Sequence, residues 1–66
     1  MNGKEFKQKR ESLGLSQEKL ARLLDVSVST VARWEQSPDQ EIRNSKMLTF
    51  SLDAIAAELS KNKKNP

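Results

Sequence analysis

One predicted helix near the middle of the chain carries a surface whose chemistry suits the base edges of double-stranded DNA. Its outward side holds Ser29, Ala32, Arg33 and Gln36, with Val28 at the N-terminal edge. A guanidinium can donate two parallel hydrogen bonds to O6 and N7 of guanine, and small apolar side chains can contact the methyl group of thymine. A serine hydroxyl can reach a base or a phosphate. We therefore expect base contacts from Val28, Ser29, Ala32 and Arg33.

The outward side of this helix follows from where its apolar residues must lie. Val31 and Trp34 are three residues apart and share one face, so they pack inward and leave the opposite side free. A preceding helix supplies the packing surface, and its small residue Ala21 allows the two helices to approach closely. The apolar residues of that preceding helix recur at helical spacing and predict one buried stripe: Leu20, Ala21, Leu23 and Leu24.

Capping and turn residues mark the ends of the two helices. Ser16 and Ser27 each stand before a helical run, where a side-chain oxygen can accept an orphan backbone N–H. Asp25 tolerates the left-handed conformation that a tight turn requires. Residues 16–36 are therefore predicted to form a helix-turn-helix, in which the second helix, 27–36, enters the major groove.

This stretch resembles the lambda-repressor-like family of helix-turn-helix proteins, also called the XRE or Cro/cI type. The family pattern has leucine-x-hydrophobic before a serine-glutamine pair, then a leucine-alanine pair, a hydrophobic-serine turn and an S-T-hydrophobic-x-x-W-E segment. Asp25 and Ser37 depart from it, because glycine is usual at both positions, but neither lies on the predicted DNA face. The matching residues are Leu13, Leu15, Ser16, Gln17, Leu20, Ala21, Val26, Ser27, Ser29, Thr30, Val31, Trp34 and Glu35.

The resemblance implies an all-α, compact domain of four or five helices that binds DNA and regulates transcription, as a repressor. It also implies that Gln17, at the start of its helix, contacts the DNA backbone, where the helix N-terminus favours a phosphate. In this family an arginine late in the first helix often pairs with the glutamate after the tryptophan, here Arg10 with Glu35. The expected phosphate contacts are Gln17, Ser27, Lys9 and Gln36.

A first helix is predicted before the helix-turn-helix, over residues 3–13. Phe6 and Leu13 form its core-facing side. Gly14 fits the left-handed residue that ends many helices.

The second half of the chain is predicted to contain a loop and a long helical segment. Residues 36–44 form the loop, anchored by Ile42. Residues 45–61 form either one long helix or two short ones, capped by Asn44 or Ser45. Their amphipathic stripe consists of Leu48, Leu52, Ile55 and Leu59, widened by Met47, Ala56 and Phe50.

The composition limits the possible functions. The 66 residues allow one domain with a small core, placed at 1–60 and followed by a basic segment, 61–66, that is expected to fray. Twelve Lys and Arg against nine Asp and Glu give a net charge of +3, which mildly favours an anionic partner.

Several classes of function have little support in the sequence. The chain lacks cysteine and histidine, so we expect no metal site, no cofactor and no enzymatic activity. No apolar run approaches the ~20 residues of a membrane span, and the polar start is unlike a signal peptide. We therefore expect a cytoplasmic protein without a membrane partner.

The predicted partner is a palindromic DNA operator bound by a homodimer, because one small module gives limited affinity. Its half-sites would lie about 34 Å apart. The end of the apolar stripe at 47–59 is the candidate dimer surface. The alternative is a protein-interaction module, such as an antitoxin or a bridging coactivator, that holds a protein partner. Arg33 and Gln17 matter for the first function, and the 47–59 stripe for the second.

Overall fold

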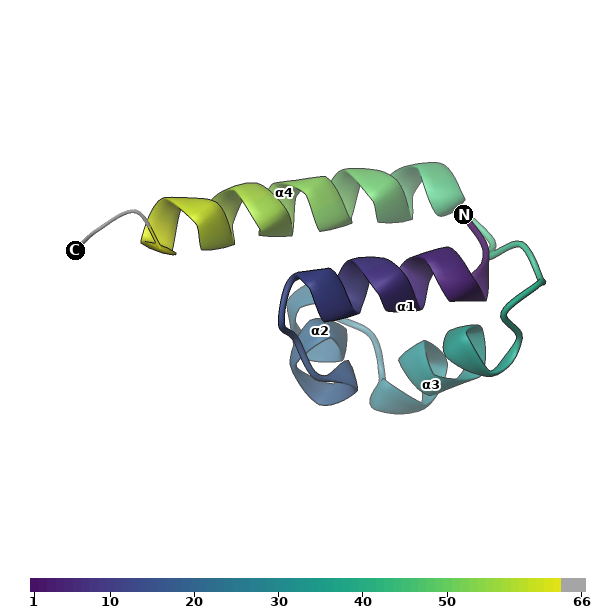
Figure 1. Ribbon diagram of the computed structural model, residues 1–66. Coiled ribbons are helices and arrows are strands. Elements are labelled where there is room, and N and C mark those ends of the chain that lie inside the picture. Colours follow the sequence, from purple (N-terminus) through teal and green to yellow (C-terminus); the bar gives the residue numbers. More distant parts are fainter. Residues whose placement is uncertain (64–66) are drawn as a thin grey trace.

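The computed structural model describes residues 1–63. This part of the chain is all-α, with four helices: α1 Gly3–Ser12, α2 Gln17–Leu24, α3 Val28–Gln36 and α4 Ser45–Lys63. In Figure 1, α1 lies in the middle, with α2 and α3 on one side of it and α4 on the other. The all-α class and the predicted helix-turn-helix are confirmed, and the number of helices is four.

The core lies where the four helices face one another. The Phe6 ring meets the Trp34 ring edge to face, with centroids 5.3 Å apart and planes at 76°. Ile42 is only 4% exposed, which confirms it as the anchor of the loop after α3. Leu13 is half-buried and packs against the core. The buried apolar set is Phe6, Leu15, Leu20, Ala21, Val31, Ile42, Leu48 and Leu52.

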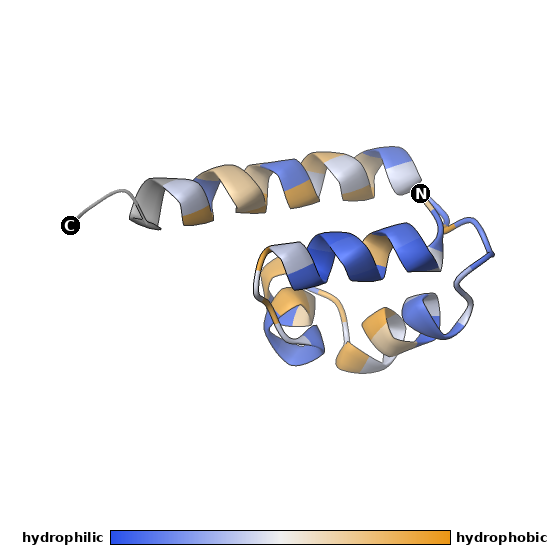
Figure 2. Ribbon diagram, viewed as in Figure 1, coloured by the Kyte–Doolittle hydropathy of each residue, from blue (hydrophilic) through white to orange (hydrophobic). Residues whose placement is uncertain are grey.

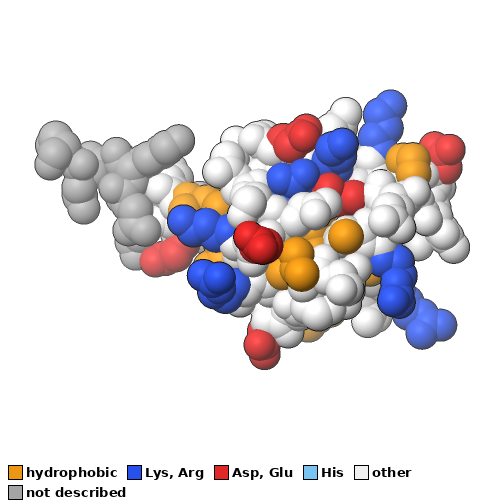
Figure 3. Space-filling view, turned by 90° about the horizontal axis from the view of Figure 1, so that it is seen from below, with side chains coloured by type: hydrophobic (Ala, Val, Ile, Leu, Met, Phe, Trp, Pro, Cys, Tyr) orange, Lys and Arg blue, Asp and Glu red, His pale blue; other side chains and the backbone are white. Residues whose placement is uncertain are grey.

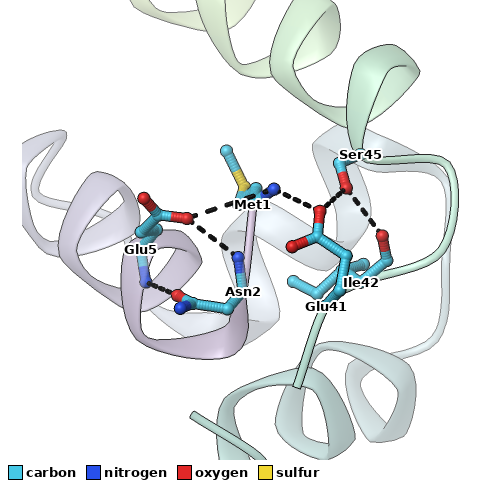
Figure 4. A network of polar contacts seen from close by, with 6 residues as sticks. All are labelled: Met1, Asn2, Glu5, Glu41, Ile42 and Ser45. Carbon is cyan, nitrogen blue, oxygen red and sulfur yellow. Dashed lines mark hydrogen bonds and ion pairs between the residues drawn. The ribbon is translucent and has the colours of Figure 1, made fainter. Parts of the chain in front are cut away.

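Polar contacts tie the start of the chain to the loop after α3 (Figure 4). Asn2 caps α1, because its side chain accepts from the Glu5 N–H while the Glu5 carboxylate accepts from the Asn2 N–H. The Met1 ammonium donates to the Glu41 carboxylate, and the Ile42 N–H donates to the Met1 carbonyl at 2.9 Å. No local sequence pattern predicts this connection, which holds the loop against α1.

Gly3 lies at a close approach between the start of α1 and the end of α3. A Cβ atom at this position would lie 2.1 Å from the Trp34 carbonyl oxygen and 2.6 Å from that of Ser37. The neighbouring Lys4 N–H donates to the Pro38 carbonyl at 3.1 Å. The contact therefore requires a residue without a side chain.

Residues 45–63 form one continuous helix, which decides between the two arrangements that the sequence left open. Asn44 precedes it in a left-handed conformation (φ 59°), and the Ser45 hydroxyl donates to the Ile42 carbonyl instead of capping the helix. The predicted basic tail falls partly in the last turn of α4, and residues 64–66 lie outside the described residues. No helix among residues 1–63 combines the length and apolarity needed to cross a membrane.

Apolar residues occur on two sides of α4, and Figure 2 shows them on both its upper and lower edges. The predicted stripe Leu48, Leu52, Ile55 and Leu59 is buried or half-buried. Met47 and Phe50, assigned to the same stripe, are instead 68% and 73% exposed. Because each residue advances about 100° around a helix, Phe50 projects from the side opposite Leu48, whereas Met47 lies on a flank and lines a pocket with Trp34 and Leu48. Leu23 of α2, also predicted buried, is 50% exposed.

Candidate DNA interface

Local sequence fixes the geometry of the α2–α3 pair. The side chains of Ser16 and Ser27 accept the backbone N–H groups of Lys19 and Thr30, as expected of N-caps. Asp25 ends α2 in the left-handed conformation, with φ 60° and ψ 42°. The predicted caps and turn are thus confirmed, and α3 is held at a fixed angle to α2.

The exposed side of α3 carries the predicted base-contacting residues. Val28 is 42% exposed, Ser29 and Arg33 are exposed, and Ala32 is half-buried beside them. On the inner side, Val31 is fully buried. Because α4 lies on the other side of α1, it leaves this face of α3 uncovered (Figure 1). The structure therefore brings the four residues to one open surface.

The predicted phosphate-contacting residues are divided between this face and another part of the molecule. Ser27 and Gln36 stand at the two ends of the α3 surface, and both are exposed. Ser27 also shares a hydrogen bond with the Thr30 hydroxyl at 2.8 Å. Lys9 lies on the side of α1 that faces α4, where its Nζ is 3.7 Å from Asp53 Oδ1. Since Lys9 is directed toward α4 rather than α3, it lies outside the candidate interface.

Gln17 takes part in a polar cluster that joins three helices. Its Nε2 donates to Glu35 Oε1 of α3 at 3.0 Å. Arg10 of α1 donates to the same carboxylate, from Nε to Oε2 at 2.7 Å and from Nη2 to Oε1 at 3.1 Å. Arg10 Nη1 also donates to the Leu15 carbonyl at 2.7 Å. The ion pair expected from the family resemblance is therefore present, with Gln17 as a further member.

Burial and hydrogen bonding act in opposite directions on the charge of this cluster. The side chains of Arg10 and Glu35 are only 12% and 5% exposed. Burial raises the pKa of Glu35, but hydrogen bonds from Arg10 and Gln17 and the charge of Arg10 together bring that pKa below its ordinary value. Glu35 is therefore ionised at neutral pH and links α1, α2 and α3.

Arg43 is a candidate contact that no sequence motif indicated. It lines a shallow pocket of about 190 Å³ at the end of α3, together with Arg33 and Gln40. The only signal in the sequence is that Arg43 is a basic residue in the loop after α3. Glu41 also lines this pocket, so Arg43 is the cation that it adds beside Arg33, and its guanidinium can donate to a phosphate oxygen.

Figure 3 shows the molecule from the side of α2 and α3. Basic side chains are spread around this face with acidic ones among them, and its centre holds apolar and uncharged side chains. The interface is thus only moderately basic, consistent with a net charge of +3. Contacts from helix ends and neutral polar groups must supplement the lysines and arginines.

Helices α2 and α3 are both capped and are joined by a tight turn, and α3 has a buried inner side and an open polar outer side. These features define a helix-turn-helix DNA-binding domain. A family model described as helix-turn-helix matches residues 6–50. The chain therefore belongs to the lambda-repressor-like, or XRE, helix-turn-helix family, whose members are DNA-binding proteins of the transcription-regulator type. Neither the curated proteins nor the solved structures contain a match.

Proposed function

We propose that the protein binds double-stranded DNA of defined sequence in the cytoplasm and represses transcription, without catalytic activity of its own. Helix α3 enters the major groove and contacts the bases through its open side. The proposed base contacts are Val28, Ser29, Ala32 and Arg33, and the proposed phosphate contacts are Gln17, Ser27 and Gln36, joined by Arg43.

The observation that carries this proposal is the orientation of α3. Val31 is 0% exposed and Trp34 packs against the core, so the two residues between them lie on the outer side, with Ala32 half-buried and Arg33 exposed. Arg33 is the only charged residue on the open side of α3, and no salt bridge involves it within the described residues. A free guanidinium at this position is available to guanine.

Arg33→Ala is expected to weaken binding to the preferred operator by about tenfold or more, because one bidentate contact to guanine is lost. The operator is first obtained by selecting bound duplexes from a random-sequence pool. Lys46→Ala serves as the control, since it also removes one positive charge but lies on α4. Equal effects of the two substitutions would show that Arg33 contributes charge only and would refute base recognition by this residue.

Two copies acting on a palindromic operator would supply the affinity that one small module lacks. The end of α4 extends past α1 in Figure 1. Beneath it, an apolar pocket of about 320 Å³ is lined by Leu23, Ala54, Ile55, Glu58 and Leu59. We propose this pocket as the dimer surface, because a two-fold axis beside that end, running from the α4 side of the domain to the α3 side, would keep both α3 helices on one side of the dimer.

Leu59→Asp is expected to abolish this dimer, because the charge would be placed in the apolar contact. Sedimentation velocity at micromolar concentration, with and without operator DNA, measures the mass of the species. Ser60→Asp adds the same charge one position along, on an exposed residue, and should leave the dimer intact. A monomer in the wild type under both conditions would contradict the proposed dimer.

The second candidate function is a protein-interaction module, such as an antitoxin or a bridging coactivator. The large exposed apolar side chains of Met47 and Phe50 on α4 favour it. Substitutions distinguish the two functions. If the regulatory activity of the protein survives Arg33→Ala and Gln17→Ala but is lost in Phe50→Glu, the protein acts as an interaction module.

A further inference from the structure

The Gln17 amide is held by a group that can only accept hydrogen bonds. An ionised carboxylate has no donor, so Glu35 Oε1 can face the amide nitrogen of Gln17 but not its oxygen. The carboxylate is itself fixed, because two nitrogens of Arg10 bind its two oxygens. The orientation of the Gln17 amide is therefore determined by its neighbours rather than by solvent.

This orientation determines what Gln17 offers to a ligand. The amide nitrogen carries two N–H groups in one plane. One of them is directed at Glu35, so the direction of the other is set by the planar geometry of the amide. A phosphate oxygen is an acceptor and can use this remaining N–H. A freely rotating glutamine would have to lose rotational freedom before it could present an N–H to the phosphate.

We propose that Glu35 is a positioning residue for DNA binding, which holds the Gln17 amide with its free N–H directed at a backbone phosphate. This inference rests on the proposed function and adds a residue that does not itself touch DNA. Glu35 also belongs to the same helix as Arg33. The cluster therefore fixes the spacing between the phosphate contact at α2 and the base contact on α3.

Two double variants separate this role from the stability that the ion pair provides. Arg10→Met with Glu35→Leu replaces the pair by apolar side chains of similar size and removes the acceptor for Gln17. Arg10→Met with Glu35→Gln also removes the ion pair, but keeps an oxygen that can accept from Gln17. Replacing a buried ion pair by apolar residues is often neutral for stability. Circular dichroism and Trp34 fluorescence establish that each variant is folded.

The probe is the operator duplex selected by the wild-type protein, carrying one neutral methylphosphonate at successive backbone positions. In the wild type, several positions should weaken binding, and Gln17→Ala should remove the sensitivity at one of them together with about fivefold of affinity. The Glu35→Leu double variant should behave like Gln17→Ala. The Glu35→Gln double variant should fall between that variant and the wild type, because its amide oxygen can accept from Gln17 but its amide nitrogen can also face the Gln17 oxygen. A purely structural role would not act on a single phosphate.

The outcomes distinguish this inference from the proposed function. If the wild type selects no duplex, the proposed function fails and the inference with it. If Gln17→Ala weakens binding while the Glu35→Leu double variant retains full affinity and the phosphate sensitivity, only the role of Glu35 is refuted. Should that double variant not fold, Glu35→Asp replaces it. Its shorter carboxylate can still pair with Arg10 but withdraws from Gln17, so the same loss is expected.

Discussion

Gly3→Ala is expected to lower the free energy of unfolding by about 3 kcal/mol, at the upper end of the cost of overpacking. The added Cβ would meet the carbonyl oxygens of Trp34 and Ser37 at 2.1 and 2.6 Å. These are backbone atoms, which cannot rotate away as a side chain would. Helices α1 and α3 must therefore separate, and the contact between Phe6 and Trp34 weakens. The loss is a large part of the roughly 3–10 kcal/mol available to a domain of this size.

Urea denaturation followed by the fluorescence of Trp34, the only tryptophan, measures this effect at the affected contact. Gly14→Ala is the matched control, because Gly14 is the only other glycine. It has φ +71°, and a Cβ atom there would have nothing within 4 Å, so alanine adds only backbone strain of about 1–2 kcal/mol. A Gly3→Ala protein as stable as Gly14→Ala would show that α1 and α3 do not approach so closely.

The helix-turn-helix could be predicted because its determinants are local. Ser16 and Ser27 cap the helices that directly follow them, and Asp25 supplies the left-handed turn within a few residues. Val31 and Trp34 share a face by spacing alone, and their burial assigns the open side of α3. The predicted base-contacting face follows from these short-range features.

The remaining features depend on contacts between residues that are distant in sequence. Gly3 needs its small size because the end of α3 passes over it, and no local pattern reveals this contact. Lys9 was predicted to contact phosphate, but Asp53, far along the chain, draws it toward α4. The same limit applies to Gln17, whose place at the start of α2 was predictable but whose hydrogen bond to Glu35 was not.

Helix α4 illustrates a different limit. Apolar residues on both of its sides satisfy a helical period, so periodicity alone does not say which side meets the core. Packing selects the side with Leu48 and Leu52 and leaves Met47 and Phe50 in solvent. Without glycine or proline to break it, the segment also continues as one helix where the family usually has two.

Glu35→Leu is expected to cost about 3–5 kcal/mol, because it leaves the Arg10 guanidinium largely buried without its carboxylate. The Arg10→Met and Glu35→Leu double variant should be far closer to the wild type, although it lacks the same ion pair. Thermal and urea unfolding of the four proteins, including Arg10→Met alone, completes a double-mutant cycle. Additive effects of the two substitutions would contradict a coupled pair.

The same pair predicts how stability depends on pH. The pKa of Glu35 is lower in the folded protein than its ordinary value of about 4.3, so the unfolded state takes up a proton first as the pH falls. The stabilisation is fully present above that ordinary value and is lost as the pH falls through the folded-state pKa. The wild type should therefore lose stability in acid more steeply than the Arg10→Met and Glu35→Leu double variant.

Measuring the free energy of unfolding of both proteins from neutral pH into this acid range isolates Glu35. The pKa of Glu41 is also lowered, by hydrogen bonds from the Met1 ammonium and Ser45, but this exposed group is present in both proteins and cancels in the difference. Parallel pH profiles would mean that Glu35 is no better stabilised as an anion in the folded state than in the unfolded chain. Since burial opposes the hydrogen bonds at this carboxylate, parallel profiles would mean that the hydrogen bonds from Arg10 and Gln17 only offset the cost of burying its charge.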